Sequence, residues 1–145
     1  MSDIRLSRDM LKNWIVVVVD DDPASLDIAS SLLTFHGATV HQAKDGEDGL
    51  RVIQAHRPAL VITDLSMPVM DGWELIRRLK IDRTLLDIPI IALTAHGRSG
   101  DRVRAIEMGC HNFLNKPLTP YTFVQDLLKL VVDIPDLAER VVTTE

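Results

Sequence analysis

The sequence contains very little cysteine and no long apolar segment. Its 145 residues include a single cysteine, Cys110, which excludes an intramolecular disulfide. One isolated thiol is typical of a reduced intracellular chain, so we expect Cys110 to be a small, partly buried structural residue; a reactive or intermolecular thiol is the alternative. No apolar run approaches the roughly 18 residues that a membrane-spanning helix requires, and the N-terminus is too polar for a signal peptide. We therefore expect a cytoplasmic protein without membrane contact.

Positive charge is also scarce. Lysine and arginine number 16 against 21 aspartates and glutamates, which gives a formal net charge of −5. Binding to a nucleic-acid backbone requires a basic surface, so we expect no nucleic-acid partner. The phosphate-binding patterns G-x-G-x-x-G and G-x-x-x-x-G-K-[ST] do not occur, and the five histidines lack the spacing of metal ligands. A nucleotide-binding loop and a histidine-rich metal centre are therefore disfavoured.

The chain does contain a regular alternation of apolar runs and amphipathic segments. The β-branched run Ile15–Val19 is typical of a strand buried on both faces of a parallel sheet. Helical patterns with capping residues at their starts separate it from four further strand patterns. Such alternation predicts an α/β protein with a doubly wound parallel sheet. The expected strands are 15–19, 38–43, 59–64, 88–95 and 112–117, and the expected helices are 22–37, 45–58, 71–82, 99–109 and 119–132.

The two ends of the chain are less regular. Met10, Leu11 and Trp14 have helical spacing, which allows a short N-terminal helix. Thr119 is the expected cap of the last long helix. We divide the chain into an N-terminal extension at 1–13, one domain at 14–132, and a C-terminal tail at 133–145 that forms either a short helix or a frayed end.

Polar residues lie where the predicted strands end. The first strand is followed by Asp20 and Asp21, the third ends in Asp64, the fourth in Thr94, and the fifth in Lys116. The carboxyl ends of the strands in a doubly wound sheet form its functional edge, so we expect these side chains to converge. Clustered carboxylates favour a bound cation, and oxygen ligands without histidine or cysteine favour Mg²⁺.

This set of groups is suited to phosphoryl transfer onto an aspartate. The nucleophile would be Asp64, while Lys116 would supply positive charge and Thr94 a hydroxyl donor. Each residue taken alone has a structural interpretation, as a turn or solvated side chain, and Asp22 is explained as a helix cap. Their joint placement at successive strand ends favours the site.

The segments VVVVDDDP, VITDLSMPVMDG, IIALTA and NFLNKP resemble the receiver domain of two-component response regulators. The resemblance covers residues 14–132 and implies a flavodoxin-like (βα)5 fold with strand order 2-1-3-4-5. It implies that Asp64 accepts a phosphoryl group from a histidine kinase or a histidine phosphotransfer protein. It further implies that the cofactor is Mg²⁺, with Mn²⁺ able to substitute.

The resemblance also implies roles for individual residues. Asp20, Asp21, Asp64 and the backbone carbonyl of Ser66 match the metal ligands, and Lys116 matches the lysine that contacts the phosphoryl group. Thr94 and Phe113 match the residues of the family's conformational switch. The positions that tune dephosphorylation in the family are matched by Ser66, Ala95 and His96. Phosphorylation would then alter a protein-binding face formed by the fourth helix, fifth strand and fifth helix. Charge reversal at Arg102 or Arg104 would test whether a partner binds this face, because unchanged binding would count against it.

Two other functions are compatible with parts of the pattern. An aspartate-nucleophile phosphatase of the haloacid dehalogenase type needs a second acid two residues after the nucleophile, where this chain has Ser66. A constitutive binding module would keep the fold without using phosphate. Only about a dozen residues follow the last helix, which leaves no room for a DNA-binding output domain. We therefore expect a stand-alone receiver, and an excised piece of a larger protein is the alternative. In either case we expect a signalling phosphoacceptor that catalyses its own phosphorylation and dephosphorylation.

Overall fold

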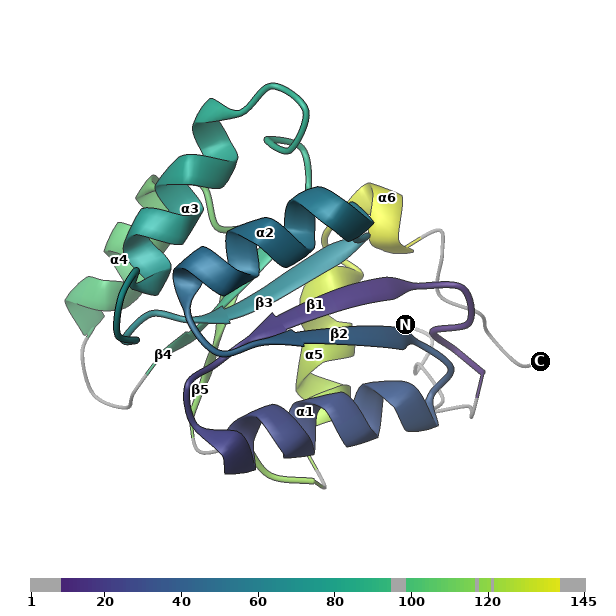
Figure 1. Ribbon diagram of the computed structural model, residues 1–145. Helices are drawn as coiled ribbons and strands as arrows, with labels where there is room; N and C mark the ends of the chain where they lie inside the picture. The colour runs from purple at the N-terminus through teal and green to yellow at the C-terminus, as the bar shows by residue number, and fades with distance from the viewer. Residues whose placement is uncertain (1–8, 95–98, 117, 121, 139–145) are drawn as a thin grey trace.

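The computed structural model describes residues 9–94, 99–116, 118–120 and 122–138 (Figure 1). A five-stranded parallel sheet runs through the centre of the molecule in the order β2-β1-β3-β4-β5. This order confirms the predicted doubly wound, flavodoxin-like fold. The strands are β1 (Ile15–Val19), β2 (Thr39–Ala43), β3 (Leu60–Asp64), β4 (Ile90–Thr94) and β5 (Asn112–Asn115).

Helices cover both faces of this sheet (Figure 1). Buried residues of α1 and α5 pack in the core on one face, and those of α2, α3 and α4 pack on the other. The alternation of strands and helices along the chain therefore appears in space as three layers. The helices are α1 (Pro23–Phe35), α2 (Gly46–His56), α3 (Gly72–Ile81), α4 (Ser99–Glu107), α5 (Phe123–Val131) and α6 (Pro135–Ala138).

The first strand shows why the sheet consists of uninterrupted apolar runs. Val16 and Val18 enter the core beneath α1 and α5, whereas Val17 and Val19 enter the core beneath α2 and α3. All four side chains are fully buried. Side chains alternate between the faces of a strand, so a strand covered on both faces needs an apolar residue at every position.

Strand register brings the predicted polar residues to one edge. The N–H of Asp20 donates to the carbonyl of Ala43 at 3.0 Å, just beyond the β1–β2 pairing. On the other side of the sheet, Thr94 pairs with Asn115, and the N–H of Lys116 donates to the carbonyl of Thr94 at 2.8 Å. The carboxyl ends of β1, β3, β4 and β5 therefore supply side chains to the same edge.

The segment before β1 differs from the predicted N-terminal helix. Residues 9–13 form a turn, in which the N–H of Lys12 donates to the carbonyl of Asp9 at 3.0 Å. Asn13 has φ 71°, a left-handed conformation that ends any right-handed helix at this point. The helical spacing of Met10, Leu11 and Trp14 nevertheless reflects burial, since all three side chains are in the core.

The last long helix also begins later than predicted. Thr119 is the expected cap, but α5 starts at Phe123 and its N-cap residue is Thr122, three residues further along the chain. The N–H groups of Thr122 and Phe123 both donate to the carbonyl of Thr119, so a turn precedes the helix. The tail contains the short helix α6, which resolves the two alternatives for residues up to Ala138.

Candidate functional site at the carboxyl edge of the sheet

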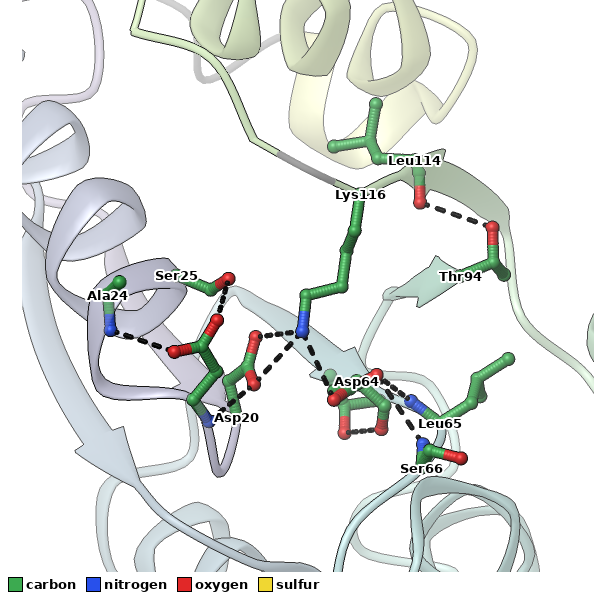
Figure 2. Close-up of polar contacts among 11 residues, drawn as sticks. Asp20, Ala24, Ser25, Asp64, Leu65, Ser66, Thr94, Leu114 and Lys116 are labelled. Carbon is green, nitrogen blue, oxygen red and sulfur yellow. Dashed lines mark hydrogen bonds and ion pairs between the residues drawn. The ribbon is translucent and has the colours of Figure 1, made fainter. Parts of the chain in front are cut away.

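Asp64 is the last residue of β3, and its carboxylate lies at the centre of the polar cluster (Figure 2). The residue is only 6% exposed. Its Oδ1 accepts hydrogen bonds from the N–H of Leu65 at 2.8 Å and of Ser66 at 3.4 Å. Its Oδ2 lies 3.3 Å from Nζ of Lys116. The carboxylate is thus held by backbone donors on one oxygen and by an ammonium group on the other.

The loop after Asp64 is held against the strand end by a glycine. The N–H of Gly72, the first residue of α3, donates to the carbonyl of Leu65 at 3.0 Å. A Cβ atom at Gly72 would lie 2.0 Å from the carbonyl oxygen of Asp64. Only glycine permits this close approach of two backbone segments. Asp71 caps α3 by accepting from the N–H of Glu74 at 2.9 Å.

Asp20 and Asp21 complete a group of three carboxylates. Asp20 is 1% exposed, and its Oδ1 accepts from the N–H of Asp22 at 2.9 Å. Nζ of Lys116 lies 3.0 Å from Oδ2 of Asp20 and therefore bridges β1 and β3. Asp21 is exposed, and one oxygen from each of Asp20, Asp21 and Asp64 falls within 4.8 Å of the others. The structure brings these four predicted residues together.

Burial and charge act against each other in this cluster. Burial raises the pKa of Asp64 above its ordinary value; Lys116 opposes this effect, and the negative charge of Asp20 adds to it. For Lys116, burial disfavours the ammonium form, but the hydrogen bond and charge of Asp20, together with Asp64, outweigh burial and raise its pKa. The ammonium group of Lys116 contacts Asp20 and Asp64, and Asp21 adds a third carboxylate to the cluster, which leaves an excess of negative charge.

The carboxylate oxygens of this cluster are suitable ligands for a divalent cation. Within the described residues, Oδ2 of Asp20 is buried and accepts no hydrogen bond, although it forms the ion pair with Lys116. A buried carboxylate oxygen that is held by an ion pair alone can take a further partner such as a cation. Three carboxylates and no histidine or cysteine match the preference of Mg²⁺ for hard oxygen ligands.

Thr94 ends β4, and its hydroxyl is directed towards β5 rather than towards Asp64 (Figure 2). The side chain is 2% exposed. Its Oγ1 lies 3.1 Å from Oδ1 of Asn115 and 3.5 Å from the carbonyl of Leu114. The shorter contact identifies Asn115 as the principal acceptor. Thr94 is therefore at the predicted edge but is not hydrogen-bonded to the Asp64 carboxylate.

Two arginines of α4 pack on aromatic rings, which the sequence did not indicate. The guanidinium carbon of Arg102 lies 4.8 Å from the centre of the half-buried Phe113 ring. That of Arg104 lies 4.1 Å from the centre of the Trp73 ring on α3. Charge reversal at either position would disturb these cation–π contacts as well as any partner, and is therefore a poor test of partner binding.

Other predicted positions fall into different environments. Cys110 is buried, and burial raises its pKa to about 12, which favours the structural interpretation over a reactive thiol. The proposed tuning residues Ala95 and His96 lie outside the described residues. Asn115 was not predicted, because the residue identity alone does not reveal that its side chain meets the Thr94 hydroxyl across the β4–β5 pair.

The doubly wound sheet, with an acid cluster and a lysine at its carboxyl edge, places the chain in the class of flavodoxin-like α/β proteins. Comparison with known sequences identifies the family within that class. The model of the response regulator receiver domain matches residues 16–128. The chain belongs to this family, whose members interact with histidine kinases or phosphotransfer proteins.

Several curated relatives are longer than the chain. The transcriptional regulator RpaA of Synechocystis is 34% identical over 86% of this chain and 53% of its own length. The transcriptional regulatory protein GlrR of Escherichia coli is 38% identical over 79% of this chain and 26% of its own length. An uncharacterized 14.6 kDa protein of Leptolyngbya boryana is 36% identical over 76% of this chain and 84% of its own length. The chain thus spans about half of the first regulator and about a quarter of the second.

Solved structures show the same architecture. The chemotaxis response regulator CheY4 of Vibrio cholerae matches with a TM-score of 0.75 and 28% identity, over 81% of this chain and 98% of that one. A receiver domain protein of Clostridium thermocellum matches with a TM-score of 0.73 and 27% identity, over 87% and 97% of the two chains.

Among the described residues, no helix combines the length and apolar character required to cross a membrane.

Proposed function

We propose that the chain is a signalling phosphoacceptor that receives a phosphoryl group on Asp64 from a phosphohistidine of a kinase or phosphotransfer protein. The observation that carries the proposal is the setting of Asp64: a buried carboxylate at a strand end, faced by Lys116 and adjoined by Asp20 and Asp21. Family membership supports the same assignment. Catalysis in such a site consists mainly of positioning and charge neutralisation.

In the transfer, a carboxylate oxygen of Asp64 forms a bond to phosphorus as the phosphorus–nitrogen bond of the phosphohistidine breaks. The electron pair of that bond stays on the imidazole nitrogen, which then takes up a proton. The backbone donors on Oδ1 orient the Asp64 carboxylate, and Nζ of Lys116 offsets negative charge on the phosphoryl oxygens. Hydrolysis at the same site would return the free carboxylate, so the chain would catalyse both its phosphorylation and its dephosphorylation.

We propose that the cofactor is Mg²⁺, with Mn²⁺ as a substitute. Asp20, Asp21, Asp64 and the backbone carbonyl of Ser66 would hold the ion. When bound, the ion supplies positive charge that neutralises the phosphoryl oxygens. The described acid cluster has one ammonium group for three carboxylates, so a divalent cation would also reduce repulsion within the unphosphorylated site.

The proposed output is a change in protein binding on the face formed by α4, β5 and α5. A cavity of about 260 Å³ opens between β5 and α5, with Phe113, Leu118 and Phe123 among its lining residues. On α4, Val103 and Ile106 are 58% and 45% exposed. Thr94 and Phe113 are the proposed switch residues that connect this face with Asp64. We propose that the protein is cytoplasmic, that its partner on this face is another protein, and that it contacts neither nucleic acid nor a membrane.

The test is phosphorylation with a small donor. Purified protein is incubated with acetyl phosphate and Mg²⁺, and its intact mass is measured. We expect a gain of one phosphoryl group that is lost in Asp64→Asn and without divalent cation. Asp71→Asn is the matched control, because Asp71 is a helix cap in the same loop and should not affect the gain. Phosphorylation that persists in Asp64→Asn would contradict the assignment; its absence from folded wild type with both acetyl phosphate and a phosphorylated histidine donor would favour a constitutive binding module.

A further inference from the structure

Two donors from different elements converge on one oxygen of Asn115. The hydroxyl of Thr94 on β4 lies 3.1 Å from Oδ1, and a terminal nitrogen of Arg102 on α4 donates to the same oxygen at 2.9 Å. An amide oxygen has two lone pairs and can accept both bonds. Because the guanidinium group can only donate, it also fixes which end of the Asn115 amide faces Thr94. We call these three residues the Thr94–Asn115–Arg102 network.

Arg102 links this network to the aromatic residue of the same strand. Its guanidinium group lies over the Phe113 ring while it holds Asn115. Arg102 is half-buried, and its contacts with Asn115 and Phe113 attach α4 to β5. A displacement of Asn115 or of α4 would therefore change the surroundings of both Thr94 and Phe113.

The Thr94 hydroxyl has one proton, and here Asn115 accepts it. A threonine that donates to a phosphoryl oxygen on Asp64 must first release this acceptor. We propose that Asn115, oriented by Arg102, is a positioning residue that holds the Thr94 hydroxyl away from Asp64 and so opposes the phosphorylated conformation. This inference rests on the proposed function and deepens it, since it specifies what the phosphoryl group must displace.

The proposal implies that loss of the acceptor favours a phosphoryl group at Asp64. The probe is beryllium trifluoride with Mg²⁺, which binds aspartate carboxylates as a phosphoryl analogue, and its affinity is measured by calorimetry. We expect Asn115→Ala to bind the analogue about 2- to 10-fold more tightly than wild type, as expected for one hydrogen bond. Arg102→Ala should shift the affinity in the same direction. Asn115 is exposed, so its truncation should leave the fold intact.

A double-mutant cycle separates positioning from a general structural effect. In Thr94→Val the hydroxyl is absent, so adding Asn115→Ala should leave the affinity for the analogue unchanged. Asn112→Ala, at the other end of β5, is the matched control and should not tighten binding. An equal gain from Asn115→Ala with and without the Thr94 hydroxyl would overturn the proposal, as would no gain in the single variant.

A second measurement decides the proposal without any phosphoryl analogue. The χ1 rotamer populations of Thr94 can be obtained from methyl coupling constants by nuclear magnetic resonance. We expect one dominant rotamer in the unliganded wild type and a redistribution in Asn115→Ala and Arg102→Ala. An unchanged rotamer in both variants would overturn the positioning role even if Asp64 binds the analogue. Redistribution without any binding of the analogue would instead contradict the proposed function and leave Asn115 as a structural partner of Thr94.

Discussion

The carboxylate of Asp64, the proposed phosphoryl acceptor, is buried in a setting that disfavours its charged form. It is buried beside Asp20, and its pKa lies above the ordinary value of 3.8, with burial as the main cause. A raised pKa means that the folded state prefers the protonated form, so the stabilising effect of that proton is lost as pH rises through the folded-state pKa. In the ionised form, the charge of Asp64 therefore opposes folding.

We expect Asp64→Asn to have a larger free energy of unfolding than wild type at neutral pH in the presence of a chelator. The amide keeps the size of the side chain but removes the charge that burial and Asp20 disfavour. The measurement is urea denaturation followed by circular dichroism.

Mg²⁺ should reverse or narrow the difference in free energy of unfolding between Asp64→Asn and wild type. A cation that binds only the folded state stabilises that state, and it does so more strongly the tighter it binds. Asp71→Asn is the control, since asparagine is as good a helix cap as aspartate and the stability should change little. A less stable Asp64→Asn in chelator would show that the ion pair with Lys116 outweighs the burial of the charge.

At the scale of elements, the pairing of β4 with β5 contains a titratable hydrogen bond. The backbone N–H of Ile90 donates to the ring atom Nδ1 of His111 at 3.3 Å. In return, the backbone N–H of His111 donates to the carbonyl of Ile90 at 2.8 Å. Only neutral imidazole can accept at Nδ1. Partial desolvation, assisted by the nearby Lys80, holds the pKa of His111 below 6.5. The folded state therefore favours the neutral ring.

We expect wild type to lose more stability than His111→Asn as the pH falls from about 8 to about 5. A group with a lowered folded-state pKa contributes fully above its unfolded pKa, and this contribution disappears as the pH falls through the folded value. The amide oxygen of asparagine offers an acceptor near Nδ1 that does not titrate. The melting temperatures of both proteins, measured across this range, test the expectation. Parallel curves would show that protonation of His111 does not weaken the strand pair.

The helices and strands also show how far sequence patterns extend. The uninterrupted apolar runs predicted the positions of β1, β3 and β4 to within two residues at each end. A strand that is buried on both faces needs an apolar residue at almost every position, and this pattern is easily recognised in a sequence. The start of α5 was placed too early because Thr119 satisfies a simple capping rule. In the structure the carbonyl of Thr119 instead accepts hydrogen bonds from the N–H groups of Thr122 and Phe123, which closes a turn before the helix.

For the whole molecule, topology explains why the acid cluster was predictable and the Thr94–Asn115–Arg102 network was not. Parallel strands place all their carboxyl ends on one edge, so Asp20, Asp64 and Lys116 had to lie near one another once the fold was known. The contact of Asn115 with Arg102 depends on side-chain orientations across two elements. Neither spacing nor composition determines such orientations.

The folded unit is larger than the segment that matches the family model. The match covers residues 16–128, but Met10, Leu11 and Trp14 before it, and Ile134 and Leu137 after it, belong to one core cluster with α1 and α5. The N–H of Leu11 also donates to the carbonyl of His36 at 2.8 Å, just after the end of α1. The segment before β1 thus closes the end of the core opposite the acid cluster.

We expect Leu11→Ala to lower the free energy of unfolding by about 2–5 kcal/mol, the usual cost of removing a buried leucine side chain. Leu11 is 1% exposed. Leu86→Ala is the matched control, since Leu86 is 36% exposed and its truncation should cost much less. Urea denaturation gives both values, and acetyl phosphate labelling should remain intact in Leu11→Ala below its unfolding transition. Equal, small losses in the two variants would mean that the N-terminal segment lies against the core without stabilising it.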